Sequence, residues 1–104
     1  MNVDYLHALA EPTRLRIVEL LQEKPRSVNE VAHGVGISQP QASKHLKYLT
    51  RSGVIEMQPV AQRRIYSLSP EPFLQLDQWL RTFDRYWGDK FKNLDHYLNE
   101  LKKG

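Results

Sequence analysis

The sequence predicts a mainly α-helical fold with one small β-hairpin. Three observations support this prediction. Through the first half of the chain, apolar residues recur every three or four positions, as they do on one face of a helix. Residues 54–58 and 64–68 instead alternate apolar and polar side chains, which is typical of strands. Helical spacing then returns over residues 70–102.

Length and composition indicate a single domain. The chain has 104 residues, which is too few for a two-domain enzyme, and its 40% of apolar residues is too high for a disordered chain. No apolar run is long enough to span a bilayer, and the N-terminus has no signal-peptide pattern, so we expect a cytoplasmic protein without a membrane partner. The absence of cysteine excludes disulfides and thiolate metal ligands, and nothing in the sequence calls for a cofactor.

Two helices are expected before residue 24. Val3, Leu6 and Leu9 have the spacing of one helix face and predict a short helix over residues 3–10. Pro12 suits the first turn of a second helix, which Pro25 ends.

Residues 27–53 predict two capped helices joined by a short turn. An S-x-x-E capping box at residues 27–30 precedes a helix that Gly34 and Gly36 end, and an S-x-x-Q box at residues 38–41 precedes a helix over residues 39–52. The residues expected to face inward from this second helix are Ala42, Leu46 and Leu49. Such a pair of helices is a helix-turn-helix candidate. The hairpin that follows would then form a wing beside it.

The last segment carries more apolar surface than the rest of the chain can cover. A continuous or gently kinked helix over residues 70–102 would be about 45 Å long. The alternative is a pair of helices that folds back at Gly88. In either case we expect a homodimer that forms through the first and last helices. The residues expected at the dimer interface are Tyr5, Leu6, Leu9, Phe73, Leu76, Trp79, Leu80, Phe83 and Trp87.

The net positive charge of the chain comes from residues 38–68. This segment has five basic residues and one acid, whereas residues 1–37 sum to −1 and residues 69–104 to zero. A local basic surface usually binds a polyanion, most often nucleic acid, although a merely solvated basic face is the alternative.

The candidate DNA-binding residues come from the helix over residues 39–52 and from the hairpin. They are Gln39, Pro40, Gln41, Ser43, Lys44, His45, Lys47, Arg51, Arg63, Arg64 and Tyr66. Glutamine can bond adenine bidentately, and serine can bond several base edges, so Gln39, Gln41 and Ser43 are candidate base readers. Pro40 lies where it could touch a thymine methyl group. The lysines and arginines are candidate phosphate contacts, and the two hairpin arginines could also enter a minor groove.

Three of these candidates have alternatives that are purely structural. Gln41 has a capping duty, and Tyr66 more often packs within a strand, which leaves only its hydroxyl group for a phosphate. His45 neighbours the inward stripe, so a half-buried histidine and a DNA contact both remain open.

Four segments resemble the ArsR-type winged-helix repressors of bacteria. They are Ala8–Ile17, Ile37–Leu46, Gly53–Ile55 and Arg63–Leu68. The resemblance covers nearly the whole chain. It implies a single winged-helix domain over residues 1–104, with residues 11–68 as the winged helix and residues 1–10 and 70–102 as dimerisation segments. It also implies a homodimer that binds an operator in double-stranded DNA and represses transcription.

The chain departs from this family at the residues that would form the sensor. Metal-sensing members that this chain resembles carry a Cys-x-Cys segment, or Asp/His pairs on the last helix. Here Tyr86 and Asn99 stand where imidazoles would be needed, beside Asp84 and His96. We therefore expect a member without metal ligands, and an unidentified small-molecule or protein effector stays open.

Other functions are less well supported by the sequence. A winged-helix module for protein or RNA is one alternative, but RNA readers usually present aromatic residues on a sheet, and none is expected here. A metal- or small-molecule-sensing repressor is another. An enzyme is not expected, because the sequence has no Gly-rich phosphate loop, no H-E-x-x-H and no G-x-S-x-G.

Overall fold

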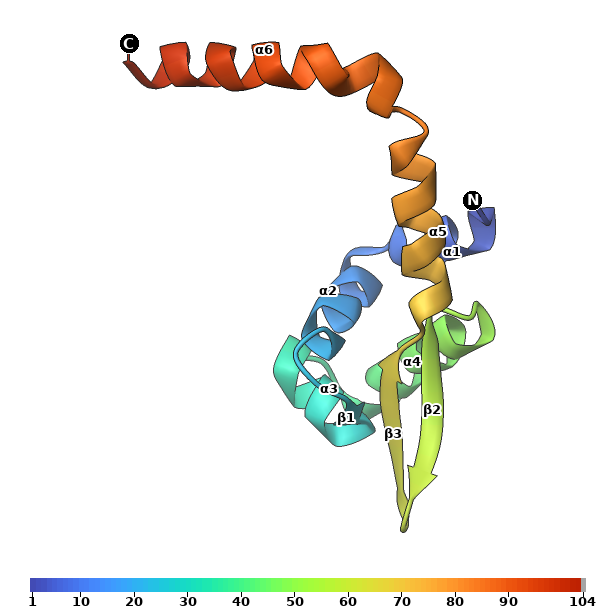
Figure 1. The fold of residues 1–104 in the computed structure, drawn as a ribbon. Coiled ribbons are helices and arrows are strands. Elements are labelled where there is room, and N and C mark those ends of the chain that lie inside the picture. Colours follow the sequence, from blue (N-terminus) through green and yellow to red (C-terminus); the bar gives the residue numbers. More distant parts are fainter. Residues whose placement is uncertain (104) are drawn as a thin grey trace.

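The computed structural model describes the backbone of residues 1–103 and the side chains of residues 1–88 and 98–102. Its elements are α1 (Val3–Leu9), α2 (Pro12–Leu21), β1 (Arg26–Ser27), α3 (Val28–Val35), α4 (Gln39–Arg51), β2 (Ile55–Val60), β3 (Arg63–Leu68), α5 (Pro70–Arg81) and α6 (Asp84–Lys103). Helices α1 to α4 gather on one side of the sheet, and α5 leads away from them to α6 (Figure 1). The mainly α-helical class with a small antiparallel sheet is confirmed.

Each helix of the helix-turn-helix, α3 and α4, begins at one of the two expected capping boxes. At the start of α3, Ser27 Oγ accepts from the Glu30 amide at 3.3 Å, and Glu30 Oε1 accepts from the Ser27 amide at 3.2 Å. At the start of α4 the same exchange joins Ser38 and Gln41, at 3.3 and 3.0 Å. Gly36 ends α3 with a φ of +73°, a conformation that glycine adopts without strain. These contacts fix both ends of the turn between α3 and α4.

The core lies between α2, α3, α4 and the base of the sheet. The three predicted inward residues of α4 (Ala42, Leu46 and Leu49) are fully buried. Helices α2 and α3 approach closely at Gly34, where a Cβ would lie 2.6 Å from Leu20 Cδ2. The remaining buried apolar residues are Ala8, Ile17, Val18, Leu21, Val31, Ala32, Val35, Val54, Ile55 and Tyr66. Burial of the α4 stripe therefore sets which face of α4 remains in solvent.

The sheet has three strands where the sequence predicts a two-stranded hairpin. Its order is β1-β3-β2, all antiparallel. Strand β1 is only two residues long, too short to show an alternating pattern, which is why the sequence did not reveal it. The hairpin strands are longer than predicted, because Val60 pairs with Arg63 and only Ala61 and Gln62 form the loop. We call β2, β3 and this loop the wing.

The prediction of one continuous or gently kinked helix over residues 70–102 is wrong, because the segment forms two helices, and their break is not at the alternative position, Gly88. It lies at Thr82 and Phe83, between α5 and α6. The Thr82 hydroxyl donates to the Trp79 carbonyl at 2.6 Å, and both backbone amides at the break bond three residues back rather than four. Such bonds tighten and end a helix, and Asp84 then suits the positive first turn of the next one.

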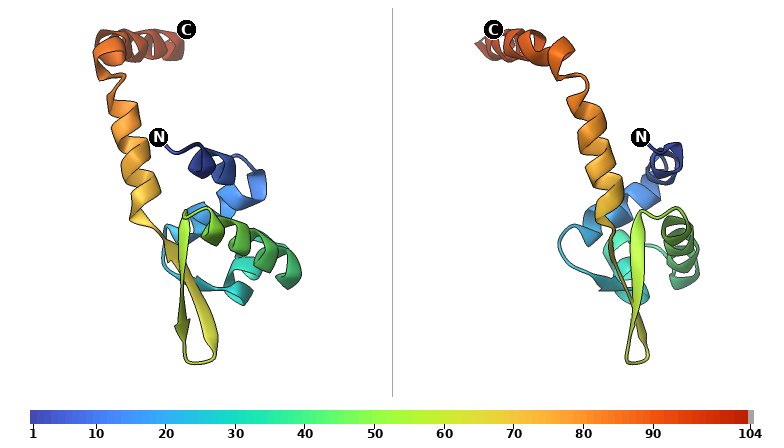
Figure 2. Two further views of the ribbon diagram at one scale, coloured as in Figure 1. Left: turned by 90° about the vertical axis from the view of Figure 1, so that its right-hand side faces the viewer. Right: turned by 45° about the vertical axis from the view of Figure 1, so that its right-hand side comes forward.

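The break gives the molecule an L-shaped arm. Helix α6 runs at a large angle to α5 and well away from α1 to α4 in every view (Figure 2). The whole molecule measures 54 × 32 × 21 Å. Within the described part of the chain, no helix has the length and apolar character needed to cross a bilayer.

Ala61 is a site of backbone strain at the wing tip. Its φ is +55°, in the left-handed region that glycine occupies more easily. We expect Ala61→Gly to raise the free energy of unfolding by about 0.5–1 kcal/mol, because relief of strain exceeds the added entropy of the unfolded chain. Chemical denaturation measures this. Ala10→Gly is the control, since Ala10 has a negative φ of −84° and gains nothing from glycine. A lower free energy of unfolding for Ala61→Gly than for the wild-type protein would contradict the assignment of backbone strain to Ala61.

Candidate nucleic-acid interface

Helix α4 keeps the predicted outward face in solvent. With Ala42, Leu46 and Leu49 buried, the opposite side and its two flanks point away from the core. The predicted contact residues that are exposed on α4 are Gln39, Pro40, Gln41, Ser43, Lys44, Lys47 and Arg51. The first four lie in the N-terminal turn and a half of the helix, where a recognition helix reads bases.

The wing-side flank of α4 and the wing enclose an open pocket. From α4 it is lined by Ser43, Lys47 and Arg51, and from the wing by Arg64 and Tyr66. Its volume is about 330 Å³, and its remaining lining residues are Val28, Thr50 and Met57. Three cations and no acid line this pocket, so its charge favours an anion, although most of its lining surface is apolar. We call it the α4–wing pocket.

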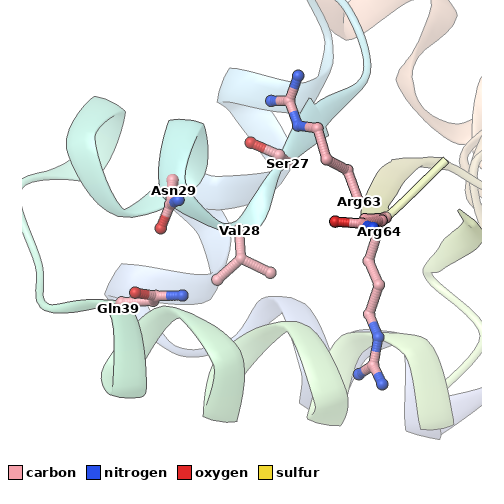
Figure 3. Close-up of a pocket in the computed structure, with 7 residues that line it drawn as sticks. Ser27, Val28, Asn29, Gln39, Arg63 and Arg64 are labelled. Carbon is pink, nitrogen blue, oxygen red and sulfur yellow. The ribbon is translucent and has the colours of Figure 1, made fainter. Parts of the chain in front are cut away.

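A second pocket of about 260 Å³ adjoins it at the N-terminal ends of α3 and α4. Gln39 lines it together with Asn29 and the two wing arginines. Figure 3 shows that these arginines point in opposite directions: Arg64 toward α4, and Arg63 toward the start of α3. The two residues therefore have different surroundings, although the sequence gave no reason to separate them.

The two wing arginines also differ in their ion pairs. Arg63 Nη2 lies 2.9 Å from Glu30 Oε1, which ties the wing to the start of α3. The pKa of Glu30 is lowered, chiefly by the hydrogen bond from the Ser27 backbone amide and to a smaller extent by Arg63. Within the described residues, no ion pair involves Arg64, Lys44, Lys47 or Arg51. The charge of these four side chains is available to a partner.

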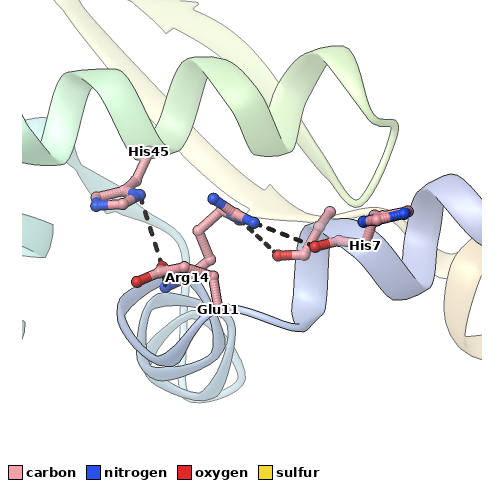
Figure 4. Close-up of polar contacts among 5 residues, drawn as sticks. His7, Glu11, Arg14 and His45 are labelled. Carbon is pink, nitrogen blue, oxygen red and sulfur yellow. Dashed lines mark hydrogen bonds and ion pairs between the residues drawn. The ribbon is translucent and has the colours of Figure 1, made fainter.

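Three of the predicted DNA-contact residues have partners or packing contacts within the protein itself. Gln41 Oε1 accepts from both the amide and the hydroxyl of Ser38, so its oxygen is already used. His45 is half-buried, and its Nδ1 lies 3.8 Å from Glu11 Oε2 (Figure 4). Tyr66 is 7% exposed and belongs to the core, although it also lines the α4–wing pocket.

A set of polar contacts that the sequence did not reveal joins α1, α2 and α4. Glu11 is the N-cap of α2, where its Oε2 accepts from the Arg14 amide at 2.7 Å. This bond is the main reason that the pKa of Glu11 is lowered. The Arg14 guanidinium donates to the His7 and Ala8 carbonyls (Figure 4). It also lies 4.2 Å from the ring centroid of Tyr48. Only the position of Glu11 before Pro12 hinted at the cap.

The predicted dimer residues fall into two groups. Tyr5, Leu9 and Phe73 pack against the protein's own core, and Leu76 is half-buried. The others are exposed: Leu6, Trp79, Leu80, Phe83 and Trp87. Trp79 and Phe83 form an edge-to-face pair at 5.2 Å, beside a second such pair of Tyr86 and Trp87 at 4.7 Å. The described part of α5 and α6 thus carries an uncovered aromatic surface at the bend of the arm.

The described residues form no cluster of three or more His, Asp or Glu side chains that could hold a metal ion. The side chain of His96 lies outside the described residues, so the expectation of a protein without a metal site stays a prediction.

Comparisons with known proteins agree with this geometry. A family model described as a helix-turn-helix domain matches residues 9–58. The HTH-type transcriptional regulator Rv2034 of Mycobacterium tuberculosis is 40% identical over 81 residues, which cover 77% of this chain and 72% of the relative. The HTH-type transcriptional repressor SmtB of the same species is 36% identical over 64% of this chain and 49% of its own. The crystal structure of an ArsR family transcriptional regulator matches with a TM-score of 0.70 at 29% identity, covering 82% of this chain and 88% of the other.

Proposed function

The chain belongs to the ArsR-type family of winged helix-turn-helix transcriptional regulators, and we propose that it is a homodimeric repressor that binds an inverted-repeat operator. The family consists of transcriptional regulators and not of enzymes, in agreement with the lack of enzyme motifs in the sequence. Because its target is DNA, the protein would act in the cytoplasm.

The α4–wing pocket is the observation that carries the proposal. With α4 in the major groove, one strand of the duplex passes between α4 and the wing, and its phosphates meet Lys47, Arg51 and Arg64. These cations have no acidic neighbour in the pocket, so their attraction for phosphate is not reduced by an internal partner. The same position would hold the exposed N-terminal turn of α4 against the base edges.

Within α4, Gln39 is the base reader that the geometry supports best. Its amide is exposed and has no capping duty, so both its oxygen and its nitrogen can bond adenine. The Gln41 oxygen is held by Ser38, which leaves at most its nitrogen for DNA. Pro40 and Ser43 supply a thymine contact and a base-edge hydroxyl, and Lys44 joins the phosphate contacts. Arg63 and His45, which face Glu30 and Glu11, serve mainly to hold their own elements in place.

The exposed aromatic surface of the arm supports the homodimer. Exposed apolar patches of this kind mark interaction sites, and an inverted repeat requires two copies of α4.

The repressor role is supported by the similarity to SmtB, which is named a repressor. A metal signal is disfavoured by the absence of cysteine and by Tyr86 and Asn99 at the places where metal ligands would stand. Trp79 lines a pocket of about 430 Å³ together with the polar side chains of Glu71, Gln75, Gln78 and Thr82, so a small-molecule effector remains an alternative signal. The alternative of an RNA-binding module lacks its usual platform, since the described sheet has Tyr66 as its aromatic residue and Tyr66 is buried.

Arg64 and Arg63 should differ in the salt dependence of DNA binding. Arg64→Ala should weaken specific and non-specific binding alike, and it should lower the slope of log K against log salt by about 2 per dimer, one for each lost phosphate contact. Arg63→Ala should change the slope less, because Glu30 already neutralises Arg63. Fluorescence anisotropy at several salt concentrations measures both slopes. Equal changes in slope for the two variants would contradict the proposal that Arg64 contacts a phosphate while Arg63 is neutralised by Glu30.

Gln39 should determine one base in each half-site. Gln39→Ala should cost about 1–3 kcal/mol of binding free energy per contact and relax the preference at that base. Selection from random DNA, followed by sequencing, measures the preference. Gln41→Ala is the matched control and should lower the stability of α4 with little change in base preference, because it removes a cap. The proposal fails if Gln39→Ala leaves every base preference intact.

The aromatic surface should be required for the dimer. Trp79→Glu combined with Phe83→Glu should give monomers or insoluble protein, because two charges would replace the apolar contact. Leu74→Glu is the control, since Leu74 is an exposed apolar residue on the opposite face of α5. Sedimentation at micromolar concentration distinguishes the species. A wild-type protein that sediments as a monomer would overturn the homodimer.

A further inference from the structure

Three contacts line the flank of α4 that faces α1 and the start of α2. Glu11 meets His45 at 3.8 Å, the Arg14 guanidinium lies over the Tyr48 ring, and the Tyr5 ring packs beside Gly53, where a Cβ would come within 3.3 Å of Tyr5 Cε1. His45, Tyr48 and Gly53 follow one another along a single flank of α4 and just past its end. We call this row of contacts the α1–α4 seam.

Arg14 is the residue of the seam that touches both helices at once. Its Nε donates to the Ala8 carbonyl at 2.7 Å and its Nη2 to the His7 carbonyl at 3.1 Å, at the C-terminal end of α1. A cation is favoured there by the helix dipole. The same guanidinium lies over the Tyr48 ring on α4, with its central carbon 4.2 Å from the ring centroid. One rigid guanidinium therefore spans the end of α1 and the side of α4.

We propose that Arg14 is a positioning residue for operator recognition, which acts through Tyr48 to fix the angle between α1 and α4 and so sets the half-site spacing that the dimer accepts. This inference rests on the proposed function, in which α1 lies at the dimer interface and α4 enters DNA. Any rotation of α4 relative to α1 occurs in both protomers, and the two-fold axis makes the shifts at the two half-sites add. Half-sites lie about one helical turn apart, so small shifts move α4 out of the groove.

The chemistry of the contact suits positioning better than stabilisation of the core. Tyr48 is 44% exposed, so its ring contributes little to the buried apolar core. Arginine is planar and has five donors, which allows it to stack and to bond carbonyls at the same time. A lysine keeps the charge but cannot reproduce this geometry.

The experiment measures affinity as a function of half-site spacing. The probe is an inverted repeat selected from random DNA by the wild-type protein, together with versions whose spacer is lengthened or shortened by one and two base pairs. The variants are Arg14→Lys and Tyr48→Leu. The controls are Tyr48→Phe, which keeps the ring, and Arg16→Lys, which alters another arginine of α2 whose side chain bonds the Val35 carbonyl instead. Thermal midpoints confirm that each variant is folded.

The wild-type protein and both controls should prefer one spacing by about tenfold or more, and both variants should reduce that ratio to about threefold or less, as expected for loss of one such contact per protomer. A wild-type protein without any spacing preference would overturn the proposed function and the inference together. Variants that keep the full wild-type preference would overturn the inference alone. Loss of preference in Tyr48→Phe as well would assign the effect to the hydroxyl and would also overturn it.

Discussion

Burial of one face of α4 is the constraint on which the rest of this structure depends. Ala42, Leu46 and Leu49 are enclosed by α2, α3 and the base of the sheet, so the rotation of α4 about its own axis is fixed. That rotation exposes Gln39 and Lys44 and turns Ser43 and Lys47 toward the wing. It also turns His45 toward the start of α2 and Tyr48 toward Arg14. The small Ala42 allows α4 to approach its neighbours closely at the end that carries the candidate base readers.

Local signals in the sequence predicted this arrangement well, because the helix-turn-helix is built from contacts close in sequence. Both capping boxes, the buried stripe of α4 and the strands of the wing could be read from spacing alone. The break at Thr82 and Phe83 could not, since a threonine hydroxyl that bonds a carbonyl three residues back leaves no periodic trace and Gly88 offered a stronger signal. The sequence did not predict β1, because a strand of two residues is too short to show an alternation of apolar and polar side chains.

The candidate site likewise has features that the sequence predicted and features that it did not. The sequence identified the basic segment and its outward residues, but it could not separate Arg63 from Arg64. That separation depends on Glu30, which is far from the wing in sequence and 2.9 Å from Arg63 in the fold. The contacts of Arg14 likewise join three helices, and only the folded chain brings them together. Contacts between separate elements of the fold are thus the part of a site that sequence spacing cannot reveal.

The pairing of β1 with β3 has a consequence for the order in which this chain folds. It joins Arg26 to Tyr66, whereas α3 and α4 meet across a turn of a few residues. Closing a long loop costs more conformational entropy than closing a short one, so local contacts form sooner. The helical half would therefore serve as the nucleus, and the wing would complete its sheet on a surface that is already formed. On a ribosome, the DNA-binding surface would then be finished only after β3 has been synthesised and has docked beside β1.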